Sequence, residues 1–167
     1  FIDVPVYGLI DRDYLASRSA LIDLNRAMPT PVSAGQPTGF VQRYPDHRDG
    51  LPGTSHVSII DQFGNAVSLT TTIESGFGSG LFVRGFLLNN ELTDFSFIPE
   101  KNGLSVANRV EAMKRPRSSM APTMIYGPAG SLRFILGSPG GSRIINYVAH
   151  TIFGLLDFNM SPHEAIN

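Results

Sequence analysis

The chain has 167 residues and a formal net charge of −1; 42% of its residues are hydrophobic and 16% are charged. This balance is typical of a single globular domain and argues against a surface that binds nucleic acid or an acidic membrane through charge. The sequence contains no cysteine, which excludes disulfides and thiolate metal sites, and no apolar run is long enough for a membrane-spanning helix.

The first 53 residues predict one helix followed by a long irregular segment. Asp11 or Asp13 is a suitable N-cap for a helix that runs to about Met28. Prolines and glycines then recur between residues 29 and 53, and no hydrophobic periodicity survives there. This composition predicts an exposed loop, the kind of segment in which a chain tolerates cleavage.

Residues 54–74 predict a β-hairpin with one polar face. The expected strands are 54–61 and 66–74, joined by a turn at 62–65. Side chains alternate across a strand, so a register centred on Phe63 sets polar residues opposite each other, whereas centring on Gly64 breaks the match. The opposed pairs are Ser58 with Ser68, His56 with Thr70, Thr54 with Thr72 and, on the other face, Val57 with Leu69.

Beyond this hairpin the sequence predicts loops, short strands and one long helix. A glycine-rich loop at 75–80 precedes a short strand at 86–90, a polar bend at 91–95 and an irregular stretch at 96–117; strands follow at about 122–126 and 131–136, and a helix at about 142–158. Ser161 and Pro162 then open another helix close to the last residue. A helix that stops after one turn indicates a piece of a longer protein.

The junction Gly53-Thr54 has the chemistry of a self-cleaving site. A threonine hydroxyl alone is a weak nucleophile, but a free α-amino group on the same residue can act as its base. That amine titrates near ~7.7–8.0 and is therefore partly neutral at physiological pH. The alternative is that Thr54 is only the first residue of a strand.

A second constellation is the glycine-rich turn that leads into the long helix. Gly140 and Gly141 leave backbone N–H groups unobstructed where a helix dipole favours negative charge. Such a turn can hold a phosphate or the oxyanion of a tetrahedral intermediate. The Lys-Ser or Lys-Thr of a phosphate-binding loop is missing after Gly141, which argues against a nucleotide site. The alternative is a turn kept for tight packing.

Other polar pairs admit two interpretations each. Ser118 and Ser119 are able to bind a carboxylate or simply to end a loop, and Glu91 with Asp94 to bind an ammonium group or to remain solvated. The four histidines lack metal-ligand spacing, so no metal site is expected. We expect His56, on a threonine-rich strand, to be a hydrogen-bonded core histidine rather than a catalytic base.

Several blocks of this sequence, in their order and spacing, resemble the γ-glutamyltranspeptidase family, strongly over 54–167 and more vaguely over 1–53. The blocks are Thr54-Ser55-His56-Val57-Ser58, Asp61-Gln62-Phe63-Gly64-Asn65-Ala66-Val67-Ser68, Leu87-Leu88-Asn89-Asn90-Glu91, Asp94-Phe95-Ser96, Lys114-Arg115-Pro116-Arg117-Ser118-Ser119-Met120-Ala121-Pro122-Thr123 and Gly137-Ser138-Pro139-Gly140-Gly141-Ser142-Arg143-Ile144-Ile145.

The resemblance implies an α+β chain with the N-terminal-nucleophile hydrolase fold, a four-layer α-β-β-α sandwich, here partial and truncated at both ends. It implies that a precursor cuts itself between Gly53 and Thr54. Residues 1–53 would then be the C-terminal end of the large subunit with its linker, and residues 54–167 the N-terminal part of the small, catalytic subunit. The new Thr54 would transfer the γ-glutamyl group of glutathione and similar amides to water, amino acids or peptides.

The resemblance also assigns roles to individual residues. Thr72 would hydrogen-bond the nucleophile, and Gly140 and Gly141 would form the oxyanion hole. Ser118 and Ser119 would hold the substrate α-carboxylate, and three acidic residues its α-ammonium: Glu74, Glu91 and Asp94. The family often has asparagine at position 74 and glutamine at position 91, so the pocket of this chain is expected to be more acidic.

The resemblance implies no cofactor and no metal. The expected partners are a γ-glutamyl small-molecule substrate and the remainder of both subunits of the same precursor, without nucleic acid or a membrane segment. The family points to the periplasm or the cell exterior, and its substrate-binding arginine belongs to the part of the large subunit that this sequence lacks, so the fragment alone is expected to be inactive. The alternatives are a related cephalosporin or glutaryl acylase, or an unprocessed, non-catalytic binding module.

Overall fold

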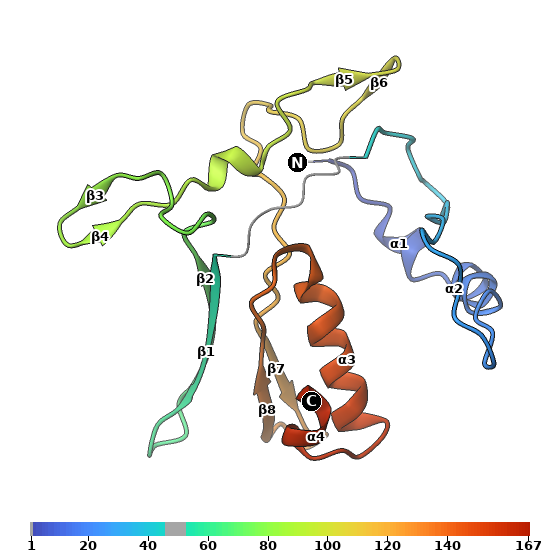
Figure 1. Cartoon of the computed structure of the whole chain (residues 1–167). Helices are drawn as coiled ribbons and strands as arrows, with labels where there is room; N and C mark the ends of the chain where they lie inside the picture. Colours follow the sequence, from blue (N-terminus) through green and yellow to red (C-terminus); the bar gives the residue numbers. More distant parts are fainter. Residues whose placement is uncertain (1, 46–52) are drawn as a thin grey trace.

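The computed structural model describes residues 2–45 and 53–167 and has an open shape in which hairpins and one long helix spread from a central region (Figure 1). The helices in these ranges are α1 (Val6–Leu9), α2 (Arg12–Ser19), α3 (Ile144–Leu156) and α4 (Pro162–Ile166), with 3-10 turns η1 (Glu91–Asp94) and η2 (Gly141–Arg143). The strands are β1 (Thr54–Ile60), β2 (Ala66–Thr72), β3 (Phe82–Val83), β4 (Phe86–Leu87), β5 (Glu100–Lys101), β6 (Leu104–Ser105), β7 (Thr123–Tyr126) and β8 (Leu132–Leu136). They pair in sequence order as antiparallel two-stranded sheets.

The β1–β2 hairpin confirms the predicted register. Thr54 lies opposite Thr72 and His56 opposite Thr70, as in a hairpin centred on Phe63. The turn is fixed by Asp61, whose Oδ1 accepts hydrogen bonds from the backbone N–H groups of Phe63 (2.9 Å) and Asn65 (2.8 Å). The polar face of the hairpin therefore ends with two threonines side by side.

The β7–β8 hairpin packs beside β1–β2 at its last strand. The Ser68 hydroxyl donates a hydrogen bond to the carbonyl of Leu136 at 3.1 Å. His56 binds Thr70 Oγ1 through Nδ1 at 2.8 Å, and its ring lies over Gly137, where an added Cβ would be 2.2 Å from His56 Cε1. His56 is hydrogen-bonded, as expected, but only half-buried, because the described residues leave one side of the hairpin open.

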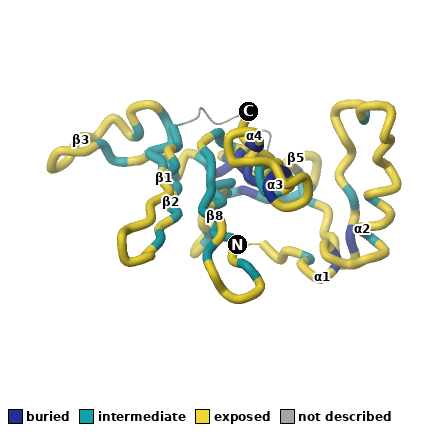
Figure 2. The backbone as a smooth tube through the Cα atoms, turned by 90° about the horizontal axis from the view of Figure 1, so that it is seen from below, coloured by how far each residue is buried: buried dark blue, intermediate teal, exposed yellow. Residues whose placement is uncertain are grey.

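The most deeply buried apolar residues gather in two places. One runs along α3, from Ile144 at its start to Val148 and Leu155, and ends with Ala165 where α4 packs against α3 (Figure 2). The other is around Phe95 and Val106.

Helix α4 begins with a complete capping box at Ser161 and Glu164, which confirms the expected helix start. The helix predicted for 142–158 begins as a 3-10 turn and ends at Leu156.

Helix α2 is shorter than predicted. Asp11 is its N-cap and accepts a hydrogen bond from the Tyr14 N–H at 2.9 Å, but the helix ends at Ser19 rather than near Met28. Leu15 in the helix is exposed, and so are Leu21 and Ile22 in the rest of the predicted span, so no packing extends the helix beyond its own propensity.

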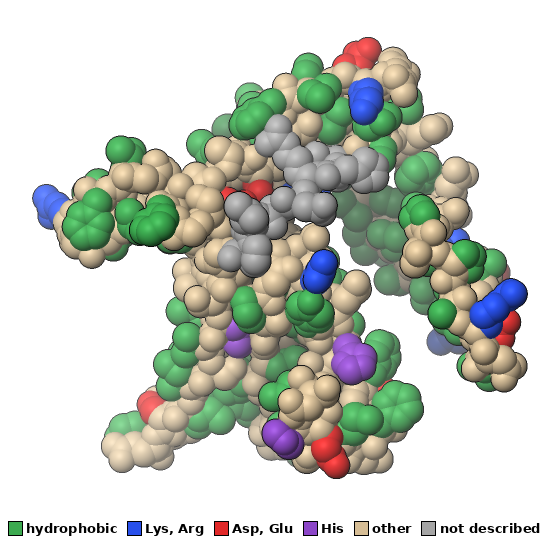
Figure 3. Space-filling view, in the orientation of Figure 1, with side chains coloured by type: hydrophobic (Ala, Val, Ile, Leu, Met, Phe, Trp, Pro, Cys, Tyr) green, Lys and Arg blue, Asp and Glu red, His purple; other side chains and the backbone are tan. Residues whose placement is uncertain are grey.

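The sequence did not predict the two short hairpins β3–β4 and β5–β6. Strand β4 does coincide with the start of the strand expected at 86–90. Large hydrophobic side chains are exposed on many elements, as the space-filling view shows for one face (Figure 3). Among the described residues, the helices are too short or too polar to cross a bilayer.

Candidate active site

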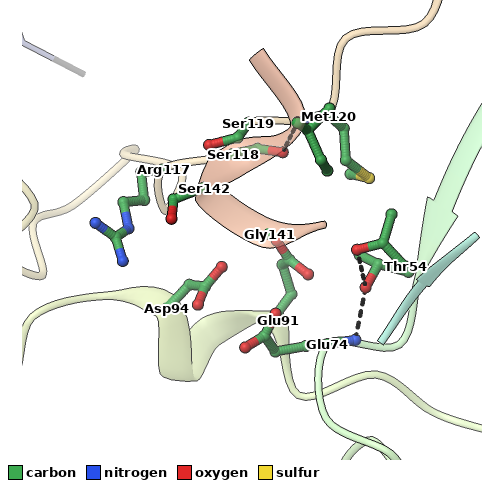
Figure 4. Close-up of a pocket in the computed structure, with 12 residues that line it drawn as sticks. Thr54, Glu74, Glu91, Asp94, Arg117, Ser118, Ser119, Met120, Gly141 and Ser142 are labelled. Carbon is green, nitrogen blue, oxygen red and sulfur yellow. Dashed lines mark hydrogen bonds between the residues drawn. The ribbon is translucent and has the colours of Figure 1, made fainter. Parts of the chain in front are cut away.

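A small polar pocket of about 50 Å³ lies where the open end of the β1–β2 hairpin meets η1, the loop at 117–120 and the start of α3 (Figure 4). This pocket brings together most of the residues that the sequence singled out, from segments far apart in the chain. Its lining consists of Thr54, Thr72, Glu74, Glu91, Asp94, Arg117, Ser118, Ser119, Met120, Gly141, Ser142 and Ile144. Gly53 and Gly140 adjoin this lining through their chain neighbours.

The two threonines at the hairpin end form a short hydrogen-bond chain. The Thr54 hydroxyl donates to Thr72 Oγ1 at 3.4 Å, and Thr72 Oγ1 also accepts the backbone N–H of Glu74 at 2.9 Å. Strand pairing positions both side chains, because Thr54 and Thr72 are register partners. The Thr54 hydroxyl is thus held in the pocket by a neighbour whose own orientation is fixed by the backbone.

Gly53 packs directly against the chain that leaves β2. A Cβ added at Gly53 would lie 2.1 Å from the carbonyl oxygen of Glu74 and 3.3 Å from that of Ser75. Glu74 itself has a φ of 72°, a left-handed conformation that is uncommon for a residue other than glycine. The backbone on the N-terminal side of Thr54 therefore fits here only without a side chain.

The glycine pair at the start of the helix has the conformation that only glycine adopts easily. Gly140 has a φ of 136° and Gly141 a φ of 56°. A Cβ at Gly140 would lie 2.8 Å from a ring carbon of Tyr147, so tight packing accounts for Gly140 in part. Gly141 lines the pocket across from Thr54 (Figure 4), where the helix start favours negative charge.

Three half-buried carboxylates meet on one side of the pocket. Glu74, Glu91 and Asp94 each place an oxygen within 4.8 Å of the others. Burial raises the pKa of Glu74, and the negative charges of Asp94 and Glu91 raise it further. Burial, followed by the charge of Asp94, likewise raises the pKa of Glu91, and Glu91 Oε2 is buried without a hydrogen-bond partner among the described residues. Carboxylates also gather in this way without an ion, so the cluster by itself assigns no metal.

The opposite side of the pocket carries hydroxyls and one guanidinium. Ser118 Oγ accepts the backbone N–H of Met120 at 3.3 Å, and Ser119 and Ser142 also line the cavity. No role was predicted for Arg117 from the sequence, yet its side chain lines the pocket (Figure 4). Its position directly before Ser118 and Ser119 was the one signal that would have drawn attention to it.

Comparison with known proteins places this chain in a family. The family model described as gamma-glutamyltranspeptidase matches residues 1–167. The chain is 38% identical over 175 aligned residues to the glutathione hydrolase proenzyme of Bacillus subtilis (strain 168), a match that covers 99% of this chain and 29% of that protein. It is 37% identical to the glutathione hydrolase proenzyme of Escherichia coli (strain K12), covering 100% of this chain and 28% of that protein.

A solved structure shows the same relationship. A crystal structure of an acivicin-inhibited γ-glutamyltranspeptidase, whose C-terminus has critical roles in autoprocessing and catalysis, matches with a TM-score of 0.58 and 45% identity over 67% of this chain and 63% of that one. The chain spans less than a third of the length of the two proenzymes. Its mixed helices and strands form part of the N-terminal-nucleophile hydrolase fold of these proteins, and the chain belongs to the γ-glutamyltranspeptidase family.

Proposed function

We propose that this chain is the processing junction and the core of the catalytic subunit of a γ-glutamyltranspeptidase, with Thr54 as both the self-cleaving residue and the nucleophile. The observation that carries the proposal is the Thr54 hydroxyl, held by Thr72 in a pocket that also contains Gly141 and three carboxylates. The short coverage of the proenzymes supports a longer precursor, whose other segments would complete the sheets and the pocket.

In self-cleavage, Thr54 Oγ attacks the carbonyl carbon of Gly53. The C–N bond between Gly53 and Thr54 breaks, the Thr54 nitrogen takes up the proton from the hydroxyl, and an ester links the two residues. Water then hydrolyses the ester, which leaves a carboxylate on Gly53 and returns the Thr54 hydroxyl. The products are two chains, and Thr54 gains the free α-amine that can serve as its base.

In turnover, Thr54 Oγ attacks the γ-carbonyl of a γ-glutamyl amide while the α-amine accepts its proton. The oxyanion of the tetrahedral intermediate would be stabilised by backbone N–H groups at Gly140 and Gly141, at the helix start. The amine leaving group takes the proton and departs, and a γ-glutamyl ester remains on Thr54. Water or the amino group of an amino acid or peptide then takes the γ-glutamyl group.

Recognition of the glutamyl group follows from the charges of the pocket. An ammonium group is attracted to the carboxylates of Glu74, Glu91 and Asp94, whereas Ser118 and Ser119 offer hydroxyl donors to a carboxylate. A glutaryl group has the same carbon chain without the ammonium, and it would leave the three acidic side chains with Arg117 as the one cationic side chain in the described lining. The pocket thus favours a γ-glutamyl donor over the glutaryl donor of a related acylase.

The intact mass of the full-length precursor tests self-cleavage. We expect two fragments from the wild type, the smaller one beginning at Thr54, and a single uncut chain from Thr54→Ala. Thr71→Ala is the matched control, because Thr71 lies on the same hairpin but is exposed and faces away from Thr72. A wild-type precursor that stays uncut leaves Thr54 without its amine and favours the non-catalytic binding module.

Turnover of matched anilides tests the substrate class. The cleaved protein should release the aniline from a γ-glutamyl anilide at a kcat/KM at least about 100-fold above that for the glutaryl anilide, because the three half-buried carboxylates gain no cationic partner from a glutaryl group. A preference for the glutaryl anilide would instead assign the protein to the acylases.

A further inference from the structure

Arg117 is the only cationic side chain among the residues that line the described pocket. Three carboxylates share the pocket with it: Glu74, two residues after the end of β2, and Glu91 and Asp94 in η1. The remaining lining from β1, β2, the 117–120 loop, η2 and the first residue of α3 is uncharged. Figure 4 shows Arg117 at the end of the pocket away from Thr54, with Asp94 close by. In the cleaved protein the Thr54 α-amine would add a second titratable cation at the opposite end.

A buried amide fixes the Arg117 backbone relative to this acidic side. Asn108 is 7% exposed, and its Oδ1 accepts the Arg117 backbone N–H at 3.1 Å. The Nδ2 of the same side chain donates to the backbone carbonyl of Asp94. One asparagine thus bridges the loop that carries the guanidinium and the turn that carries two of the carboxylates. The packing of Asn108 therefore holds the backbone of Arg117 close to the turn that carries Glu91 and Asp94.

We propose that Arg117 is a charge-balancing positioning residue, which favours the ionised form of Glu74 so that the pocket can accept the ammonium group of a donor. The identity of the donor in this inference rests on the proposed function, whereas the effect of Arg117 on the carboxylates does not. Burial and the neighbouring Asp94 and Glu91 raise the pKa of Glu74, and the positive charge of Arg117 acts in the opposite direction and lowers it. In a variant without the Arg117 charge, Glu74 should therefore become protonated at a higher pH than in the wild type.

The kinetic test compares Arg117→Leu and Arg117→Lys with the wild type in the cleaved full-length protein, using a γ-glutamyl anilide. We expect the acidic limb of kcat/KM to move upward by about 0.5–1 pH unit in Arg117→Leu, through a rise in KM rather than a fall in kcat. Arg117→Lys keeps the charge and should restore the limb. Arg115→Leu is the matched control, because Arg115 lines a neighbouring cavity, which Arg117 also lines, but does not line this pocket.

Two kinetic outcomes would overturn the proposal. A KM raised by the same factor at every pH would mean that Arg117 contacts the donor's carboxylate directly, because the ionisation of the cluster would then be unchanged. An unaltered pH profile in Arg117→Leu would mean that Arg117 does not influence the carboxylates at all.

A second measurement does not depend on turnover. In the full-length protein, the ¹³C signal of the Glu74 side-chain carboxyl, identified by its loss in Glu74→Gln, can be followed through a pH titration. Its midpoint should be higher in Arg117→Leu than in the wild type, and an equal midpoint would refute the proposal. If the wild type turns over no γ-glutamyl donor, the proposed function fails, and this titration still decides the role of Arg117.

Discussion

The absence of a side chain at position 53 shapes the junction where we expect cleavage. Since a Cβ at Gly53 would overlap the Glu74 carbonyl oxygen, Gly53→Ala has to displace the peptide bond that Thr54 attacks. We expect self-cleavage of the full-length precursor to slow about 10- to 100-fold, because small misplacements of reacting atoms are costly. The time course of fragment appearance measures this.

The matched control for Gly53→Ala is Gly76→Ala, whose added Cβ would meet no atom within 4 Å. That variant should cleave at the wild-type rate. Equal rates for Gly53→Ala and the wild type would show that the contact with Glu74 does not hold the junction.

The raised pKa of Glu91 predicts a pH-dependent cost to stability. Its folded-state pKa lies above the unfolded value, so the cost is absent below the unfolded pKa and grows as pH rises toward the folded pKa. Glu91→Gln should therefore raise the Tm by about 1–3 °C at neutral pH and leave it unchanged near pH ~4. Thermal unfolding across this pH range provides the measurement.

The exposed carboxylate of Glu111 is a control, because its replacement should change the Tm at neutral pH in the opposite direction. The ion pair between Glu111 and Arg109, 2.9 Å apart, lowers the pKa of Glu111. Glu111 thus contributes stability above its unfolded pKa, and this contribution is lost as pH falls. Glu111→Gln should lower the Tm slightly at neutral pH. A Glu91→Gln protein that is less stable than the wild type at neutral pH would contradict our account of the cluster.

The residues of the site were predictable to the extent that their chemistry is local. The junction at Thr54 stands out because a loop changes into a strand there, and the glycine pair because it precedes a helix. The serine pair and the pair Glu91 and Asp94 were visible in the sequence but allowed two interpretations each. The resemblance assigned their roles and added Glu74, and the structure places all five residues in one pocket. The contribution of Arg117 was not predictable, because the direction of a side chain in an irregular loop depends on distant partners such as Asn108.

At the scale of elements, Gly137 lies where the two larger hairpins contact each other. The His56 ring occupies the space that a side chain at Gly137 would need, so Gly137→Ala must push β8 away from β1. We expect a loss of about 1–3 kcal/mol in the free energy of unfolding of the full-length protein, as for other overpacked sites. Urea denaturation gives this value.

The double variant with His56→Ala, which removes the ring, serves as the control for Gly137→Ala. If the clash causes the loss, the two changes should be strongly non-additive. Additive effects would show that the glycine is needed for another reason.

The elements themselves were predictable where the pattern was long. Alternation over seven residues fixed the β1–β2 register, because slipping by one residue would turn every side chain to the opposite face. The β3–β4 and β5–β6 strands have only two residues each, too few for alternation to show. The Asn102-Gly103 turn of the second of these, with both residues at positive φ, was the available signal.

At the scale of the whole molecule, the exposed apolar surface governs how the chain behaves in isolation. Val57, Ile59, Val67 and Leu69 on one face of the β1–β2 hairpin are each between 41% and 54% exposed. A contiguous face of this kind marks a contact with another part of a protein. In our proposal, that part belongs to the same precursor.

The isolated 167-residue chain should therefore bind a hydrophobic dye such as ANS strongly and associate at micromolar concentration, whereas the full-length protein should do neither. The reason is that the longer chain covers the apolar face in our proposal. Dye fluorescence and light scattering measure the two properties. An isolated chain that stays monomeric and does not increase the fluorescence of the dye would show that the apolar face is stable without contact to another segment.

The left-handed backbone at Glu74 has a consequence for how this site can change during evolution. Asparagine adopts positive φ more readily than glutamate, so an exchange of Glu74 for asparagine would relax the backbone and remove one negative charge in a single step. The same residue presents its carbonyl to Gly53 and its carboxylate to the pocket. In our proposal, a substitution of Glu74 would therefore affect both the cleavage of the precursor and its preference among donors.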